Sequence, residues 1–148
     1  MSGSPPEAPV IFIDRNSGGR TFRDLLTAKG LEVVLHDEVF RQTVADEDWL
    51  SAAGAKGWVV ITGDNATTAS PLFLDRLSRS RTFVFILKGL NGASPAGKAD
   101  CILNVYPKIQ ALVRMKEPPA IWRVGRDGVM RSFEFQRVLV RMRIRRRA

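Results

Sequence analysis

The stretch WVVITGDN, residues 58–65, is an apolar run of strand length that passes through Thr62 and Gly63 and reaches the carboxylate of Asp64. A short apolar run bounded by turn residues is typical of a strand that is covered on both faces. Removing water from a carboxylate costs several kcal/mol unless a partner compensates, so a buried strand does not normally end on an acid. The position of Asp64 therefore raises the question of which other residues converge on it.

Strand-like and helical patterns alternate on both sides of this stretch. The other apolar runs of strand length are PVIFID (9–14), LEVVLH (31–36) and TFVFILK (82–88). Helical patterns cover TFRDLLTAKG (21–30), DEDWLSAAGAKG (46–57), SPLFLDRLSRS (70–80) and PAGKADCILNVYPKIQALVRM (95–115). In AIWRVGRDGVMRSFEF (120–135), Asp127-Gly128 predicts the turn of a β-hairpin. The sequence therefore predicts an α/β fold, a three-layer sandwich with a mostly parallel central sheet, a C-terminal β-hairpin and a basic tail.

Residues that start or stop helices mark the ends of these patterns. Gly30 is expected to terminate the first helix, and Pro71 is expected in the first turn of the third. In the helix that Pro71 begins, the spacing predicts Leu72, Phe73 and Leu77 on the apolar side.

The composition suits one soluble domain, since 45% of the 148 residues are apolar and 26% are charged. No apolar run reaches the length of about 18 residues that a membrane span needs, so no membrane partner is expected. The first nine residues, MSGSPPEAP, lack the basic start and apolar core of a signal peptide and are expected to be flexible. The single cysteine, Cys101, excludes an internal disulfide and suits a reducing cytoplasm, and one His with one Cys excludes structural zinc.

Positive charge is concentrated toward the end of the chain. Residues 120–148 hold nine arginines and two acids, whereas the other 119 residues hold 14 basic and 13 acidic residues. The formal net charge of +8 therefore belongs almost entirely to the last fifth of the chain. Such asymmetry predicts a polyanionic partner, with nucleic acid as the first candidate and a solvated tail as the alternative. Within this segment, the candidates for phosphate contacts are Arg143 and Arg145.

Three acids are expected to meet at one edge of the sheet. Asp14 ends the first strand, Asp64 follows the third, and Asp46 begins the helix that leads into the third. The carboxyl ends of parallel strands share one edge, and ligands bind outside it. Neighbouring carboxylates repel one another unless a cation lies between them, and Mg²⁺ or Mn²⁺ takes such oxygen ligands. Each acid alone also fits a helix cap or a loop; together they predict a metal site that activates a water against a phosphate.

The motifs VIFIDRN, HDEVF…ADEDWLSAAGAKGWVVITGDN and FVFILKG, in this order, resemble the VapC-type branch of PIN-like domain toxins. The resemblance rests on a strand ending in Asp with a nearby Asn, a D-x-x-x-L-x-x-A helix, and a strand closing on T-x-D. The resemblance covers residues 10–128 and implies a PIN-like domain there, between the flexible segment at 1–9 and a basic extension at 129–148 that the composition predicts. It implies a Mg²⁺- or Mn²⁺-dependent endoribonuclease that is the toxin of a type II toxin–antitoxin system.

The resemblance also implies roles for particular residues and partners. The catalytic residues and metal ligands become Asp14, Asp46 and Asp64. Asn16 would orient Asp14 or a water and belongs with the substrate-binding residues. The implied partners are an RNA substrate, a cognate antitoxin protein and, as is common among such toxins, a second copy of the chain. Further candidates for contacts with substrate phosphates near the acids are Arg15, Arg20 and Lys88.

Two other interpretations remain open. A receiver-like phosphoacceptor domain also has acids after its first and third strands and a later lysine, for which Lys88 would serve. Receivers normally carry paired acids after the first strand, however, whereas Asp14 is followed by Arg15, and they make no use of Asp46. The second alternative is a non-catalytic RNA-binding module that keeps the fold and uses only its basic tail.

Overall fold

The computed structural model of the chain describes residues 9–14, 17–39, 46–64, 69–135 and 140–141, with only the backbone described at 46–48. Its centre is a six-stranded sheet with the order β2-β1-β3-β4-β5-β6. Neighbouring strands pair in parallel except β6, which is antiparallel to β5. The predicted α/β fold with a mostly parallel sheet is confirmed. The strands are β1 (Ile11–Ile13), β2 (Val33–Leu35), β3 (Val59–Thr62), β4 (Phe83–Leu87), β5 (Ala120–Val124) and β6 (Met130–Phe133).

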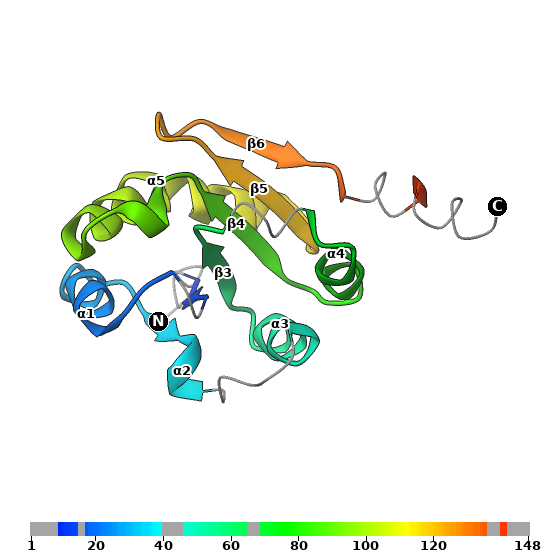
Figure 1. Ribbon diagram of the computed structural model, residues 1–148, viewed down its shortest axis with the longest axis horizontal. Helices are drawn as coiled ribbons and strands as arrows, with labels where there is room; N and C mark the ends of the chain where they lie inside the picture. Colours follow the sequence, from blue (N-terminus) through cyan, green and yellow to red (C-terminus); the bar gives the residue numbers. More distant parts are fainter. Residues whose placement is uncertain (1–8, 15–16, 40–45, 65–68, 136–139, 142–148) are drawn as a thin grey trace, which may run out of the picture.

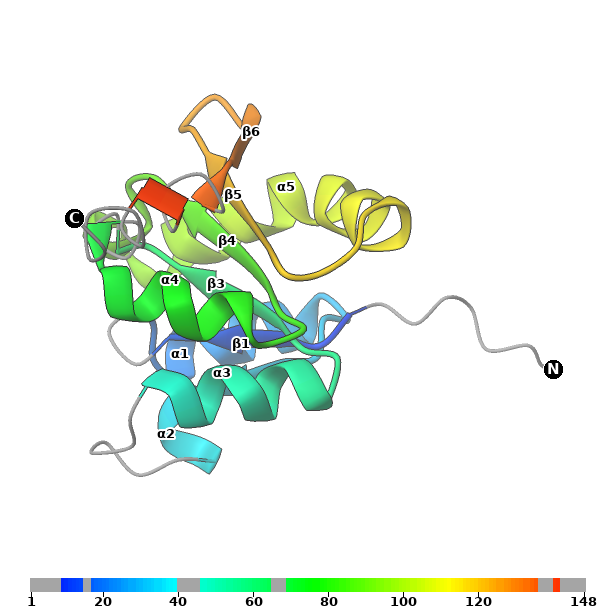
Figure 2. The same ribbon diagram turned by 90° about the vertical axis from the view of Figure 1, so that its right-hand side faces the viewer.

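Helices cover both faces of the sheet and give the predicted three layers (Figures 1 and 2). The first and last long helices, α1 and α5, pack on one face, and α3 and α4 pack on the other. None of the helices in the described part of the chain is long and apolar enough to cross a membrane. The helices are α1 (Arg20–Ala28), α2 (His36–Val39), α3 (Asp46–Ala55), α4 (Pro71–Ser78), the 3₁₀ helix η2 (Leu90–Gly92) and α5 (Pro95–Met115).

The central strands are apolar along their whole length because helices lie over both of their faces. Every residue of β1, β3 and β4 is buried. Alternate side chains enter two cores: Ile13 and Phe85 pack toward α1 and α5, whereas Phe12 and Val60 pack toward α3 and α4. The continuous apolar runs in the sequence therefore reflect a sheet that is buried on both sides.

Helix α4 begins at Pro71, as predicted, but its buried face differs from the predicted one. Leu72 is 59% exposed, so its predicted place on the buried side is wrong. Leu74 is fully buried instead, together with Phe73 and Leu77. Residues three and four apart share a helix face. Phe73 and Leu74 lie four and three residues before Leu77, so these side chains share the buried face, whereas Leu72, five residues before Leu77, lies outside it.

The predicted β5–β6 hairpin is present, with Val124 opposite Met130 and Ile121 opposite Phe133. Gly128 lies in its turn with a φ of +80°, in the left-handed region that glycine adopts without strain. Because β5 runs parallel to β4, this turn lies at the edge of the sheet where β1, β3 and β4 also end. The hairpin therefore adds its turn to the edge at which ligands bind in such sheets.

Candidate active site

The carboxyl ends of β1 and β3 lie side by side at the point where the order of the strands in the sheet reverses. From β1 the chain moves outward to β2 and then returns to the other side of β1, where β3 lies. In open α/β sheets, ligands bind outside the carboxyl ends of the strands at such a switch point. Asp14 directly follows β1, and Asp64 lies two residues beyond Thr62, the last residue of β3. The structure therefore places these two acids at adjacent strand ends.

The hydroxyl of Thr62 connects the two acids. Thr62 Oγ1 donates to Asp14 Oδ2 at 2.9 Å and accepts from the backbone N–H of Asp64 at 3.1 Å. Thr62 is 4% exposed, whereas Asp14 is half-buried and Asp64 is exposed. Breaking either hydrogen bond would leave the buried Thr62 hydroxyl with one partner fewer, which costs free energy. The hydroxyl thus holds the Asp14 carboxylate and the backbone of Asp64 in one arrangement.

Ser17 fixes the loops after β1 and β3 to one another. It is fully buried, and its Oγ accepts from the Gly63 N–H at 2.9 Å. The same Oγ lies 3.4 Å from Thr62 Oγ1, and Ser17 is the donor there because the Thr62 proton goes to Asp14. From the first turns of α5, Lys98 Nζ donates to the Ser17 carbonyl at 2.8 Å. A third element of the chain therefore supports the acids, through residues that the sequence did not single out.

Gly63 is required between Thr62 and Asp64 because no side chain fits there. A Cβ at this position would lie 2.3 Å from Asn91 Oδ1 and 2.9 Å from the Asn91 backbone nitrogen. Both distances are well inside van der Waals contact, so a larger residue would push η2 away from the loop that follows β3. The middle residue of the T-x-D pattern is therefore set by packing.

A small cavity of about 260 Å³ opens beside Asp14. It lies at the carboxyl ends of β1 and β2 and is also lined by Arg20, His36, Asp37 and Glu38. Arg20 is the first residue of α1 and brings a positive charge to the cavity that Asp14 lines. Its predicted contact with a substrate phosphate stays a prediction, but its position beside the cavity suits that role.

Glu38, although it lines the same cavity, is engaged within the protein. Its Oε1 accepts from the Leu35 N–H at 3.0 Å, and its Oε2 forms an ion pair with Arg23. The Leu35 N–H, followed by the Arg23 guanidinium, holds the pKa of Glu38 below its usual value. The Glu38 carboxylate therefore has a structural role at the start of α2, and we do not count it with Asp14 among the candidate metal ligands.

Residues 9–89 of the sequence match a family described as PIN like domain. The match spans β1 to β4, includes Asp14, Asp46 and Asp64, and covers more than half of the chain. The chain belongs to the PIN-like domain family. This family is generally associated with nucleases. No curated protein and no solved structure gives a significant match to the chain.

The third predicted acid of this PIN-like domain, Asp46, is the first residue of α3. In the chain, α3 comes after β2 and leads into β3, and these two strands run in the same direction. Its first turn therefore lies at the carboxyl edge of the sheet, as Figure 2 shows. The side chain of Asp46 lies outside the part of the chain that the structure describes. Also outside the described residues are the predicted substrate contacts Arg15, Asn16, Arg143 and Arg145.

The donors at this edge of the PIN-like domain fit a hard divalent cation. The Asp14 carboxylate accepts from the Thr62 hydroxyl, and Asp64, whose backbone N–H donates to the same hydroxyl, carries a second carboxylate at the neighbouring strand end. Mg²⁺ sites commonly use one or two carboxylates with waters and substrate oxygens. Within the described residues, no group of three or more His, Cys, Asp or Glu side chains is placed to hold a metal ion. A third protein ligand would therefore have to come from residues beyond these, of which Asp46 is the predicted one.

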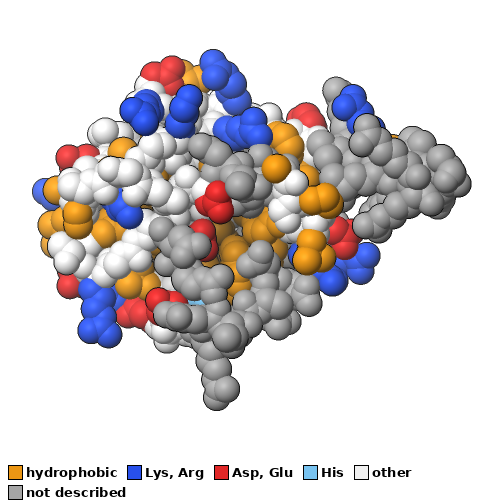
Figure 3. All heavy atoms as spheres, in the orientation of Figure 1, with side chains coloured by type: hydrophobic (Ala, Val, Ile, Leu, Met, Phe, Trp, Pro, Cys, Tyr) orange, Lys and Arg blue, Asp and Glu red, His pale blue; other side chains and the backbone are white. Residues whose placement is uncertain are grey.

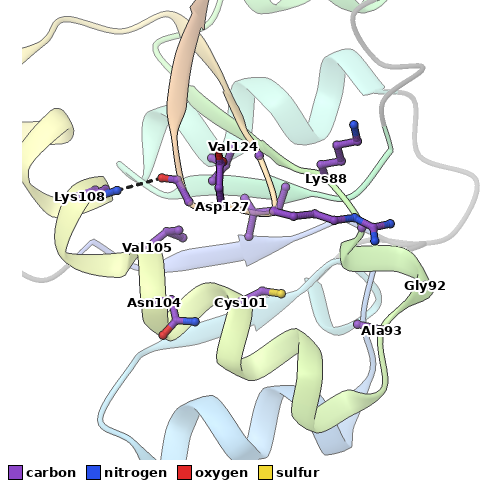
Figure 4. Close-up of a pocket in the computed structure, with 14 residues that line it drawn as sticks. Lys88, Gly92, Ala93, Cys101, Asn104, Val105, Lys108, Val124 and Asp127 are labelled. Atoms are coloured by element: carbon purple, nitrogen blue, oxygen red, sulfur yellow. Dashed lines mark hydrogen bonds between the residues drawn. The ribbon is translucent and has the colours of Figure 1, made fainter.

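A larger cavity, of about 740 Å³, lies beyond Lys88. It is bounded by the end of β4, by α5 and by the β5–β6 turn, and Lys108 Nζ donates across it to the Gly128 carbonyl (Figure 4). Among the described residues, the one carboxylate that lines it is Asp127, whose Oδ1 accepts from the Val129 N–H at 3.0 Å. Neither Asp14 nor Asp64 lines this larger cavity. We therefore assign the candidate active site to the carboxyl ends of β1 and β3, where Thr62 joins Asp14 to the Asp64 backbone and the smaller cavity opens beside Asp14.

Proposed function

We propose that this PIN-like domain is a metal-dependent endoribonuclease whose metal ligands are Asp14, Asp46 and Asp64. The observation that carries the proposal is the Thr62 hydroxyl, which joins Asp14 to the backbone of Asp64 at the switch point of the sheet. When bound, Mg²⁺ or Mn²⁺ would supply an activated water and would neutralise charge that develops on the phosphate. The reaction is the hydrolysis of an RNA phosphodiester bond.

Residues around the acids have separate tasks in this proposal. Thr62 orients the Asp14 carboxylate by its hydrogen bond to Oδ2. Ser17 and Lys98 hold the loop that follows β1, so that Asp14 keeps its position when substrate binds. Asp64 is exposed, and in this proposal it is accessible to incoming substrate. The residues assigned to contacts with the substrate are Arg15, Asn16, Arg20, Lys88, Arg143 and Arg145.

Cleavage of single-stranded and structured RNA by the purified protein tests the proposal. We expect cleavage with Mg²⁺ or Mn²⁺ and none with EDTA. In Asp14→Asn and Asp64→Asn, the rate should fall by at least about 100-fold, the upper end of the loss seen when a residue supporting a metal is removed. Mn²⁺ binding measured by calorimetry gives a second readout and should weaken in both variants.

The matched control for this experiment is Glu32→Gln. Glu32 is an exposed acid just before β2, at the edge of the sheet opposite to Asp14 and Asp64. The variant removes one negative charge, as Asp14→Asn and Asp64→Asn do, but away from the candidate site. It should cleave RNA and bind Mn²⁺ as the wild type does. Cleavage by Asp64→Asn at the wild-type rate would exclude the site.

We further propose that this nuclease is the toxin of a type II toxin–antitoxin system, as its motifs imply. Residues 136–148 hold six arginines and no acid, a composition that complements an acidic antitoxin. Expression of the wild-type chain in bacteria should arrest growth, whereas Asp64→Asn at the same level should not. Normal growth with both chains would contradict the toxin assignment. The nuclease proposal would still be tested separately by the RNA cleavage assay.

The strand order also favours a second candidate, a receiver-like phosphoacceptor domain. The order β2-β1-β3-β4-β5 is that of flavodoxin-like folds, and Lys88 follows the strand next to the one that precedes Asp64. Incubation with acetyl phosphate, followed by intact-mass measurement, separates the two functions. A stable phosphate adduct lost in Asp64→Asn would favour the receiver, and an unchanged mass would favour the nuclease. RNA binding without cleavage in the presence of any metal would favour the non-catalytic RNA-binding module instead.

A further inference from the structure

Exposed cations surround the β5–β6 hairpin. Figure 3 shows Lys and Arg side chains gathered over the part of the molecule where Figure 1 places this hairpin. We call four of them the hairpin cations: Lys88, Arg123, Arg126 and Arg131. All but Lys88 lie beyond residues 9–89, which match the PIN-like family.

Two of the hairpin cations lie directly opposite each other. Arg123 on β5 and Arg131 on β6 are register partners, so their side chains leave the same face of the sheet with Cβ atoms about 5 Å apart. Like charges in this arrangement destabilise a sheet. The Arg123 guanidinium lies 4.7 Å from the centre of the Phe133 ring, which orients it over that face. An anion bound between the two arginines would interact favourably with both charges.

A cavity of about 500 Å³ opens on this face of the hairpin. Its lining includes Lys88, Arg123 and Arg131 together with the Phe133 ring, and no carboxylate is among the described residues that line it. Figure 4 shows Lys88 extending from the end of β4 on the side away from α5. A basic cavity with an aromatic ring and no acid has the composition of surfaces that bind single-stranded nucleic acids.

Arg126 brings a further positive charge to the turn after β4, beside Gly89. Gly89 has a φ of +83°, and a Cβ at this position would lie 3.0 Å from Arg126 Nε. The absence of a side chain at Gly89 therefore lets the hairpin turn place the Arg126 guanidinium against the turn after β4. The Lys88 N–H also donates to the Val124 carbonyl at 2.9 Å, which joins the same two segments. The structure thus places the Arg126 guanidinium against the residue that follows Lys88.

We infer that the hairpin cations bind the phosphates of a single-stranded RNA and lead it to the edge that carries Asp64. Lys88 follows β4, the neighbour of β3, and neighbouring strands are about 4.8 Å apart. An RNA strand along the hairpin therefore reaches the candidate active site without leaving this edge of the sheet. The Arg123 guanidinium, held over Phe133, presents a flat surface on which bases stack, and an acidic polypeptide would not use it.

The inference rests on the proposed function for the class of ligand, but binding at the hairpin does not require catalysis. The test is therefore binding of a fluorescein-labelled oligo-uridine strand by fluorescence anisotropy, in EDTA, with the full chain. In Arg123→Gln/Arg131→Gln, affinity should fall by roughly tenfold per arginine. The slope of log K against log salt should become shallower by about 0.7 for each phosphate that the variant no longer binds.

Three comparisons make this test decisive. Arg114→Gln removes an exposed arginine at the far end of α5, at the opposite edge of the sheet, and should bind like the wild type. Arg123→Lys/Arg131→Lys keeps both charges and should restore the salt slope, which a folding defect would not do. Polyglutamate should compete poorly with the oligonucleotide.

Each remaining outcome has one meaning. Binding by the double glutamine variant equal to that of Arg114→Gln would overturn the inference. Polyglutamate binding as tightly as oligo-uridine, with the same loss in the double variant, would also overturn it and would make the hairpin a surface for an acidic protein. Hairpin-dependent RNA binding without cleavage under any metal would support the inference and contradict the nuclease proposal.

Discussion

At the carboxyl ends of β1 and β3, charge is held by hydrogen bonds from buried groups, whereas at the β5–β6 hairpin like charges face each other. Asp14 accepts a 2.9 Å hydrogen bond from Thr62, which is 4% exposed. Arg123 and Arg131 are exposed register partners on adjacent strands. Satisfied polar groups in a protein interior add to stability, and opposed like charges subtract from it.

This difference separates two ways in which a protein prepares a surface for a charged ligand. The edge at Asp14 is organised before any ligand arrives, because Ser17, Gly63 and Lys98 hold the loops around it. The hairpin instead brings two like charges into register on one face, where a bound anion would interact with both. Substitutions at the edge should therefore lower both stability and activity, and substitutions at the hairpin should lower binding while they raise stability.

Among substitutions that leave both acids in place, the largest effect is expected from Thr62→Val. The change keeps the shape of the side chain but removes the donor to Asp14 Oδ2 and the acceptor for the Asp64 N–H. RNA cleavage should fall by about 10- to 100-fold, and the free energy of unfolding in urea by about 1–3 kcal/mol. Thr27→Val is the control, because its hydroxyl bonds the Arg23 carbonyl on an exposed helix face. Equal losses of activity and stability in both variants would show that the Thr62 hydroxyl does not position Asp14 and Asp64.

Gly63→Ala is expected to lower stability by about 1–3 kcal/mol. Its Cβ would lie 2.9 Å from the backbone nitrogen of Asn91, so the loop after β3 must shift and carry Asp64 with it. Gly92→Ala is the matched control, because a Cβ at Gly92 meets nothing within 4 Å. Thermal unfolding of the two variants measures the difference, and equal melting temperatures would contradict this account of Gly63.

Acid should weaken the protein through Glu38. Its pKa in the folded state is lowered by the Leu35 N–H and then by Arg23, so its contribution to stability is present above the pKa of an unfolded-state glutamate. That contribution is lost as the pH falls through the lowered folded-state pKa. In thermal unfolding across this acidic range, Glu38→Gln should lose less stability than the wild type does. Parallel pH profiles for the two chains would contradict the prediction.

The smallest effect, and the one of opposite sign, is expected from Arg131→Gln. Removing one of two like charges in direct register should raise the free energy of unfolding by about 0.2–1 kcal/mol. Urea unfolding at low salt measures the gain, which should shrink in high salt because salt screens exposed charges. A loss of stability at low salt would mean that the repulsion inferred between Arg123 and Arg131 is absent.

The positions of Asp14 and Asp64 could be predicted because the carboxyl ends of parallel strands share an edge and because each acid ends an apolar run. The contact of Lys98 with Ser17 could not, since it joins residues 81 positions apart and depends on how α5 packs across the sheet. For a similar reason, the spacing in α4 predicted Leu72 rather than Leu74 as buried: the pattern gives a stripe, but tertiary packing selects its centre.

The hairpin shows a different limit of sequence reasoning. Composition predicted a polyanion-binding segment in residues 120–148, and the predicted phosphate contacts were Arg143 and Arg145, which lie outside the described residues. Nothing in the composition indicates that Arg123 and Arg131 become partners, because that depends on the turn length between β5 and β6. Charge content could be predicted from the sequence, but the pairing of charges required the register.

The place of β6 at the end of the sheet gives the hairpin arginines a consequence for solubility. An edge strand can pair with the edge of another molecule, and charged side chains such as Arg131 are among the devices that prevent it. A variant with neutral residues in place of Arg123 and Arg131 should have a more stable monomer. It should also aggregate more readily through edge-to-edge strand pairing as the protein concentration rises.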